Sequence, residues 1–401
     1  MATAEWKPAK LDELGFVGRG KSRHRPRNAA FLYGGRYPFF QTGDIKAANF
    51  HLTEYSQTYS EEGLAQSKLW KPGTLCITIA ANIAESAILG IEGCFPDSVV
   101  GFVADPDKAD VRFVKYYMEI LKLQMQSVSR GTTQDNLSLD KLLTFDFLVP
   151  PLSVQRRIAG ILSAYDELME NSQRRIRLLE AMARALYREW FVHFRFPGHE
   201  KRPRVASPLG DIPQGWEVRT VKDVATVTYG FPFASKKFNT DGIGTPVIRI
   251  RDILDASINT FTDEEAELKY HIKNGDILVG MDGDFHMCIW SSGHAFQNQR
   301  VAKFESNGEI GNYHLFLALE LPIQTWNKSI VGTTVAHLGD MHIKTIQIAW
   351  PPAKILAKAR EILEPMSEQI IMLKRRVQNL RRTRDLLLPR LLSGQVNLTT
   401  N

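Results

Sequence analysis

Two long heptad repeats constrain the fold of this 401-residue chain more than any other sequence feature. The first repeat runs from about residue 152 to 191 and places apolar residues three and four positions apart between charged flanks. A helix of about 38 residues would be roughly 57 Å long, which exceeds the interior of one compact domain. A shift of 201 residues brings the same heptad frame to the C-terminal part of the chain. We therefore predict two long helices that pack along each other, so that the chain holds its own coiled-coil partner.

The predicted seam of this helix pair consists of two positions in every heptad. In the first helix these positions hold Leu162, Tyr165, Met169, Ile176, Leu179 and Leu186. In the second helix they hold Leu363, Met366, Ile370, Leu373, Val377, Leu380 and Leu387. Ser172 and Arg384 are polar residues on the same seam, and such residues fix the register and orientation of paired helices at some cost in stability. The other basic residues of the second helix are interpreted as its solvated face.

The repeat extends into the rest of the chain, which indicates a duplication. Trp6 recurs as Trp216, a Gly-Thr-Thr segment at 131–133 recurs at 332–334, and a double proline at 150–151 recurs at 351–352. The predicted fold class is therefore mixed α/β (α+β), with one globular unit used twice and a long coiled-coil helix closing each copy. The predicted segments are domain 1 (1–150), helix 1 (151–193), a proline-rich linker (194–215), domain 2 (216–352), helix 2 (353–394) and a tail (395–401).

Composition narrows the class of protein and its surroundings. The net charge is +6 and the sequence pI is about 9.1, which fits a polyanionic partner. The three cysteines are scattered without a CxxC pair, which favours reduced thiols and argues against structural zinc. The N-terminal residues contain no apolar signal region, and no apolar run reaches the ~20 residues of a membrane span. We therefore expect a cytoplasmic protein without membrane contact.

A basic segment near the N-terminus is the first candidate for DNA contact. Residues 15–22 match the phosphate-loop pattern GxxxxGK[ST], but the preceding residues make a poor buried strand and the following ones cannot begin an amphipathic helix. We therefore interpret the segment as a glycine-rich, flexible loop that lies on a DNA backbone. Its predicted phosphate contacts are Arg19, Lys21, Arg23, Arg25 and Arg27.

Two polar loops and two short basic clusters complete the candidate DNA contacts. The loop at 130–136 and its repeat at 331–337 share the Gly-Thr-Thr frame but differ afterwards, as two readers of different sequences would. A simple capping turn without a partner explains the frame equally well. The candidate residues are Arg130, Thr132, Thr133, Gln134, Asn136, Thr333, Thr334 and His337, followed by Lys236, Lys237, Arg249 and Arg251.

Catalytic patterns are scarce, so we expect a chain that is not an enzyme. Asp282, Asp284 and His286 lie close together without a further ligand cluster, and we expect no metal site there. An adenine methyltransferase needs a polar residue before Pro-Pro and an aromatic residue after it. The two double prolines here are followed by Leu152 and Ala353.

The duplicated helices and the central segment resemble one known family. Each helix follows a double proline and opens with an Ile-and-Leu heptad, and a Phe-Pro-Gly-His-Glu segment at 196–200 precedes Pro-Leu-Gly-Asp-Ile-Pro-Gln-Gly-Trp at 208–216. In these features the chain resembles the specificity subunits of type I restriction-modification systems.

The resemblance implies an architecture, a function, partners and cofactors. The two long helices would lie antiparallel between two target-recognition domains, with pseudo-two-fold symmetry. Each target-recognition domain would read one half of a split target in double-stranded DNA, while the helices would set the spacer and dock modification (methyltransferase) and restriction (translocase/nuclease) subunits. The chain itself would bind no cofactor, and S-adenosylmethionine, ATP and Mg would belong to those partners. The remaining alternatives are a basic scaffold or assembly adaptor that does not read sequence and, less favoured, a nucleotide hydrolase.

Overall fold

The structure is a computed structural model that describes residues 6–129, 137–255, 258–329, 337–396 and 398. The chain divides into two compact units, and the boundary between them cuts both long helices. Unit 1 comprises residues 1–171 and 378–401, and unit 2 comprises residues 172–377. Among the helices of the described part, none is long and apolar enough to cross a membrane.

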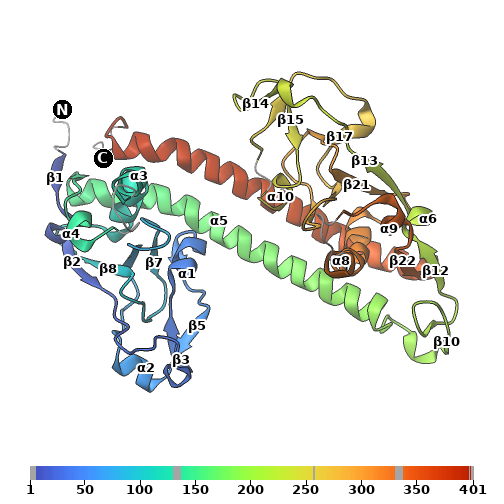
Figure 1. The fold of residues 1–401 in the computed structure, drawn as a ribbon, viewed down its shortest axis with the longest axis horizontal. Coiled ribbons are helices and arrows are strands. Elements are labelled where there is room, and N and C mark those ends of the chain that lie inside the picture. Colours follow the sequence, from blue (N-terminus) through green and yellow to red (C-terminus); the bar gives the residue numbers. More distant parts are fainter. Residues whose placement is uncertain (1–5, 130–136, 256–257, 330–336, 397, 399–401) are drawn as a thin grey trace. The chain divides into compact units, whose positions relative to one another are not determined.

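Unit 1 is built on a five-stranded sheet in the order β2-β8-β6-β7-β4 (Figure 1). Its strands are β1 (Lys7–Ala9), β2 (Gly15–Arg19), β3 (Tyr33–Phe39), β4 (His51–Leu52), β5 (Gln57–Tyr59), β6 (Leu75–Thr78), β7 (Ser86–Leu89), β8 (Val99–Ala104) and β9 (Phe147–Val149). Its shorter helices are α1 (Thr42–Ala47), α2 (Glu61–Ala65), α3 (Val111–Ser129) and α4 (Leu139–Leu142). The pairs β3-β5 and β1-β9 form separate antiparallel ribbons.

The central strand β6 packs against apolar side chains on both faces of the sheet. Successive side chains of a strand point to opposite sides. Leu75 and Ile77 pack in the core cluster that contains α3, whereas Cys76 packs in the cluster that contains Ile45 of α1. All of β6 is buried, which explains its uninterrupted apolar sequence.

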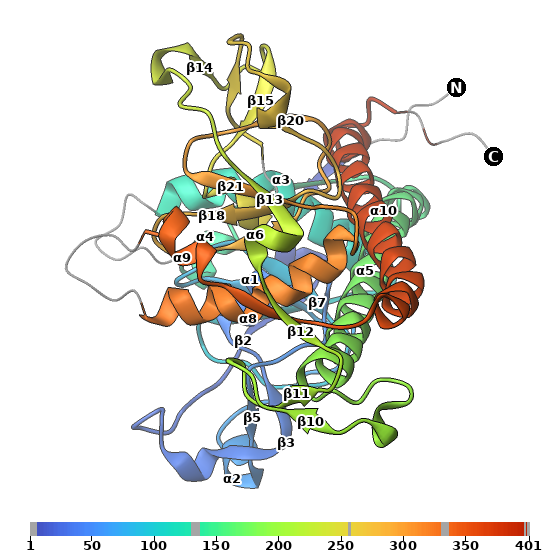
Figure 2. The same ribbon diagram turned by 90° about the vertical axis from the view of Figure 1, so that its right-hand side faces the viewer.

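Unit 2 repeats this architecture with a four-stranded sheet in the order β13-β21-β18-β19 and a second sheet in the order β14-β16-β15-β20-β17. Its strands are β12 (Glu217–Thr220), β13 (Ala225–Tyr229), β14 (Phe238–Asn239), β15 (Thr245–Ile248), β16 (Phe261–Thr262), β17 (His271–Ile272), β18 (Ile277–Gly280), β19 (Met287–Ile289), β20 (Ala295–Gln297), β21 (Val301–Ser306) and β22 (Gln347–Trp350). Its shorter helices are α6 (Val221–Val224), α7 (Asp252–Asp255), α8 (Asn312–Ser329) and α9 (Asp340–Lys344). Figure 2 shows α8 beside the four-stranded sheet, in the position that α3 has in unit 1.

The duplication predicted from the sequence is confirmed strand by strand. The order β2-β8-β6-β7 corresponds to β13-β21-β18-β19, and the ribbon β1-β9 corresponds to β12-β22. Individual backbone hydrogen bonds recur as well. The Ile79 amide donates to the Ser98 carbonyl over 2.9 Å, and the Met281 amide donates to the Arg300 carbonyl over 3.0 Å. The two copies can therefore be compared residue by residue.

The two long helices are α5 (Leu152–Tyr187), which continues as a π-helical turn at Arg188–Val192, and α10 (Ala353–Leu392). In unit 1, Arg384 contacts Asp166, while Arg157 donates to the carbonyl of Leu398 further along the chain, so the segments run antiparallel. In unit 2, Lys374 of α10 pairs with Glu180 of α5 over 3.0 Å. The predicted seam residues are buried or half-buried, and Arg375, Arg376, Arg381 and Arg382 are exposed.

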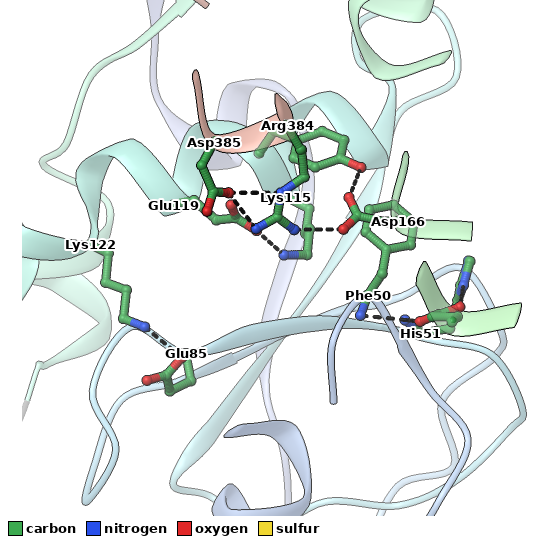
Figure 3. Close-up of polar contacts among 11 residues, drawn as sticks. Phe50, His51, Glu85, Lys115, Glu119, Lys122, Asp166, Arg384 and Asp385 are labelled. Carbon is green, nitrogen blue, oxygen red and sulfur yellow. Dashed lines mark hydrogen bonds and ion pairs between the residues drawn. The ribbon is translucent and has the colours of Figure 1, made fainter. Parts of the chain in front are cut away.

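A buried polar network joins α5, α10 and α3 in unit 1 (Figure 3). Asp166 is 0% exposed and accepts hydrogen bonds from Arg384 Nη1 at 2.5 Å and from the Tyr116 hydroxyl. Arg384 also donates to the neighbouring Asp385 over 2.7 Å. The polar seam residue Arg384 thus has a specific partner on the other helix of its unit.

A second polar contact attaches β4 to α5. Glu170 accepts the backbone amides of Phe50 and His51 at 3.2 and 2.9 Å, and its other oxygen lies 3.0 Å from His51 Nδ1. The hydrogen bond to Glu170 raises the pKa of His51. Burial alone would raise the pKa of Glu170, but the bonds from His51 and the two amides hold it below its ordinary value.

The proline-rich linker between the π-helical turn and β12 has a defined structure. It contains the small hairpin of β10 (Arg204–Val205) and β11 (Ile212–Pro213). Phe194 and Phe196 contact Trp216, with ring centroids 5.2 and 5.4 Å away. These aromatic contacts anchor the proline-rich segment to the start of the repeated unit.

Candidate nucleic-acid interface

Hydrogen bonds with side chains hold the backbone of unit 1's basic segment in place. The amides of Arg23 and His24 both donate to Gln66 Oε1, over 2.5 and 2.9 Å. Arg25 Nη1 donates to the carbonyls of Ser22 and His24 over 2.7 and 2.9 Å. The segment therefore presents its charges from a defined backbone.

Asp97 brings two of the five predicted phosphate contacts together. Arg27 Nη2 lies 3.0 and 2.8 Å from the two carboxylate oxygens of Asp97, and Arg19 Nε donates to the Asp97 carbonyl over 3.1 Å. The ion pair reduces the charge that Arg27 offers to a phosphate. Lys21 and Arg23 are exposed, and within the described part of the chain their side chains have no ion-pair partner.

The interpretation of residues 15–22 as a flexible loop was wrong for its first five residues. Gly15–Arg19 form β2, which pairs antiparallel with β8. A Cβ atom on Gly15 would lie 2.2 Å from the Val103 carbonyl oxygen, and one on Gly18 would lie 2.9 Å from the Phe16 ring. Gly15 permits the close approach of β8 and Gly18 leaves room for the ring of Phe16, so Gly15–Arg19 do not form a loop around a phosphate.

A basic residue that sequence reasoning missed lies beside this segment. Lys68 Nζ lies 3.6 Å from the centroid of the Trp70 ring and 4.7 Å from that of Phe16, whose side chain is exposed. Burial and the charge of Lys21 lower the pKa of Lys68. An exposed aromatic ring beside a lysine suits contact with nucleic acid. Lys68 is distant from the basic segment in sequence, so charge clustering along the chain could not reveal it.

In unit 2 the structure gathers polar residues around an open pocket of about 590 Å³. The ends of β15 and β18 and the β20–β21 connection contribute its lining. The pocket is lined by Arg249, Ile250, Arg251, Leu254, Asp284, His286, Asn298 and Arg300. Guanidinium, imidazole and amide groups are the donors and acceptors that proteins use on base edges and phosphates.

Carboxylates position the arginines of this pocket. Asp252 caps α7 by accepting the Arg249 amide at 2.9 Å, and its oxygens lie 3.5 Å from Arg249 Nε and 3.9 Å from Arg251 Nε. Asp282 lies 3.3 Å from Arg300 Nε and 2.6 Å from His337 Nδ1. Two predicted contacts, Arg249 and Arg251, thus share one pocket, and His337 contacts Asp282, which in turn pairs with the pocket residue Arg300.

The other predicted contacts are not gathered in this way. Lys236 and Lys237 lie on a short 3₁₀ turn, and Lys237 pairs with Glu264 over 3.5 Å. The remaining candidates lie outside the residues that the structure describes: Arg130, Thr132, Thr133, Gln134, Asn136, Thr333 and Thr334.

Metal ligation has no support in the described ranges, which contain no group of three or more His, Cys, Asp or Glu side chains suited to an ion. Asp282, one of the acidic residues considered for such a site, is engaged with Arg300 and His337.

Arg300 and Asn298 are pocket residues that the sequence interpretation did not select. Both lie in the short polar connection between β20 and β21, which contains one charged residue and no charge cluster. Comparison of the two copies could have found them, because Arg300 corresponds to Ser98 on the same backbone frame. His286 was considered only as a metal ligand.

A family model described as the type I restriction modification DNA specificity domain matches residues 3–181 and 213–382. The chain therefore belongs to this family, and the two matches follow the two copies of the repeat. The MjaIX type I restriction enzyme specificity subunit of Methanocaldococcus jannaschii is 23% identical over 98% of this chain and 94% of its own length. The HindI specificity subunit of Haemophilus influenzae is 21% identical over 98% of this chain and its whole length.

A solved structure supports the fold independently. The crystal structure of a type I restriction-modification S subunit from M. genitalium has a TM-score of 0.66, with 16% identity over 98% of this chain and 97% of the other. At this identity the similarity shows the fold alone.

Proposed function

We propose that this chain is the specificity subunit of a type I restriction-modification assembly and that each unit reads one half of a bipartite DNA target. The observation that carries the proposal is the duplication. One backbone frame occurs twice, with different side chains where the frame meets solvent. A protein that reads two different half-sites needs such a pair of similar supports. The family match and the names of the two relatives support the same assignment.

Contacts with phosphates and contacts with base edges have separate roles in this proposal. Exposed charges such as Lys21 and Arg23 in unit 1 hold the phosphate backbone and make binding sensitive to salt. Anchored polar groups, such as those of the unit 2 pocket, read base edges. The target-recognition domains of the proposal are residues 1–150 and 216–352.

The long helices would set the unread spacer and dock the modification subunits. Half-sites one DNA turn apart are separated by ~34–36 Å, a distance that a helix of about 57 Å can span. Apolar side chains remain exposed on the outer faces of both helices, including Leu178, Met182, Met372 and Leu386. Such side chains fit a protein interface.

Catalysis would belong to the partners. The chain's double prolines lack the polar and aromatic neighbours of a methyltransferase loop, and its phosphate-loop pattern lies partly in a strand. S-adenosylmethionine, ATP and Mg would accordingly be bound by modification and restriction subunits.

Domain exchange tests the proposal. Residues 1–150 or 216–350 would be replaced by the corresponding residues of a relative with a different known target, and each chimera would be assembled with the modification subunit. We expect one half of the methylated sequence to change in each case. If both chimeras methylate the original sequence, or bind all sequences equally, a basic scaffold without sequence reading replaces the proposal.

A further inference from the structure

Arg300 is an anchored arginine whose terminal nitrogens remain available. Its Nε lies 3.3 Å from Asp282 Oδ2, while His337 Nδ1 lies 2.6 Å from the other oxygen of the same carboxylate. The Arg300 side chain is 55% exposed, and its two terminal nitrogens have no partner among the residues described. The carboxylate therefore restrains the guanidinium while leaving two parallel donors facing the pocket.

Comparison of the two copies indicates that the contacts of Arg300 and His337 with Asp282 are not required for folding. The amides of Leu137 and Leu338 donate to the carbonyls of Ile79 and Met281, over 2.9 and 2.7 Å, so the frame around these side chains is the same in both copies. On that frame, Arg300 and Asp282 correspond to Ser98 and Ala80, and His337 aligns in sequence with Asn136, which lies outside the described residues. Unit 1 therefore forms the same sheet without these side chains. A contact required for folding would be present in both copies.

The nearby capping contact gives a second example of the same pattern. Asp44 accepts the Gln41 amide at 2.7 Å, just as Asp252 accepts the Arg249 amide. The capping carboxylate is kept, whereas Gln41 is replaced by the pocket residue Arg249. The pocket residues Arg249 and Arg300 therefore differ from their counterparts Gln41 and Ser98, although the backbone contacts around them recur.

Resting on the function proposed above, we infer that Arg300, oriented by Asp282, reads a guanine in the half-site of unit 2. A guanidinium with two parallel donors matches the O6 and N7 acceptors of guanine in the major groove. The pocket environment favours a base edge over a phosphate. The charges of Arg249, Arg251 and Arg300 are offset by the carboxylates of Asp252, Asp282 and Asp284, so the pocket has no excess positive charge to attract a phosphate.

The test is a comparison of base preferences at constant salt. The chain, assembled with its cognate modification subunit, would be used to select from a randomised duplex library. Arg300→Lys keeps the charge and removes the bidentate fork. The matched control is Arg219→Lys in the same unit. Arg219 is not a pocket residue, and its guanidinium pairs with Glu217 over 3.0 Å and with Glu309 over 3.1 Å.

For Arg300→Lys we expect the preference for guanine at one position of the unit 2 half-site to fall about 5-fold to 150-fold. The rest of the motif and the unit 1 half-site should be unchanged, as should the whole motif for Arg219→Lys. Asp282→Asn should weaken the same single position, because Asp282 is a positioning residue. A merely structural Asp282 would lower the unfolding temperature and affinity without altering the motif.

Two results would overturn the inference. If Arg300→Ala weakens binding to all sequences equally, reduces the slope of log K against log salt by about one and is largely rescued by Arg300→Lys, Arg300 contacts a phosphate. An unchanged motif in Arg300→Lys would show that Arg300 does not read a base. The proposed function fails separately, if the wild-type assembly selects no bipartite motif.

Discussion

Replacing Arg384 by methionine should destabilise unit 1 by about 3–5 kcal/mol, because it leaves a buried carboxylate without its cation. Asp166 is 0% exposed, and burial raises its pKa even with Arg384 beside it. After the substitution Asp166 would keep only the Tyr116 hydroxyl, since nearby Lys115 is paired with Glu119.

The reciprocal substitution should cost less. In Asp166→Asn, Arg384 retains its contact with Asp385 at 2.7 Å, so we expect about 1–3 kcal/mol. The double variant should be more stable than Arg384→Met alone, because a neutral amide then replaces the stranded carboxylate. Arg382→Met is the matched control on the same helix. Arg382 is exposed, and its loss should change stability by about 0.5 kcal/mol or less.

Hydrogen exchange followed by mass spectrometry measures these effects within each unit. Peptides of α3 and β6 should exchange faster in Arg384→Met, while peptides of unit 2's sheet serve as the internal reference. Protection of unit 1 equal to that of the wild type would refute the reasoning. So would a loss in Asp166→Asn larger than in Arg384→Met.

Three further predictions address the β4 contact, the helices and unit 1's polar loop. His51→Gln should cost about 1 kcal/mol between about pH 4.5 and 6.5 and less outside that window, measured by urea unfolding across pH. The pKa of His51 is raised in the folded state, so its contribution to stability is complete below pH 6.5 and is lost as the pH rises through the folded-state pKa. The pKa of Glu170 is lowered in the folded state, so its contribution to stability is complete above pH 4.5 and is lost as the pH falls through the folded-state pKa. A pH-independent cost would contradict this reasoning. Inserting one heptad into each long helix at the unit boundary lengthens the helix pair by about 10.5 Å. Selection from a randomised duplex library should then return a spacer about three base pairs longer, with both half-sites unchanged. An unaltered spacer would show that the helices do not set its length. Gln134→Ala should relax preference in one half-site only, and a uniform loss would mark a backbone contact.

The sequence predicted the architecture well because the fold depends on periodic apolar patterns. The apolar runs that begin at Leu75, Val99 and Ile277 form β6, β8 and β18. The long helices begin within a few residues of the double prolines. Apolar periodicity and prolines act locally, so the printed sequence contains the necessary information.

The interface was less predictable because it depends on side chains that are distant in sequence. Asp97 neutralises Arg27 from 70 residues away, and Lys68 approaches the rings of Phe16 and Trp70 through the fold of the sheet. The glycine pattern at 15–20 suggested a loop because a close approach between strands and a phosphate cradle both require glycine. Tertiary packing decided between those two uses.

Selection from a randomised duplex library, with the full chain assembled with its cognate modification subunit, tests the central claim most directly. We expect a motif of two fixed half-sites separated by an unread spacer of constant length. Binding that depends on salt but returns no motif, or a single continuous motif, would contradict the claim that two copies of one fold read two halves of a DNA target.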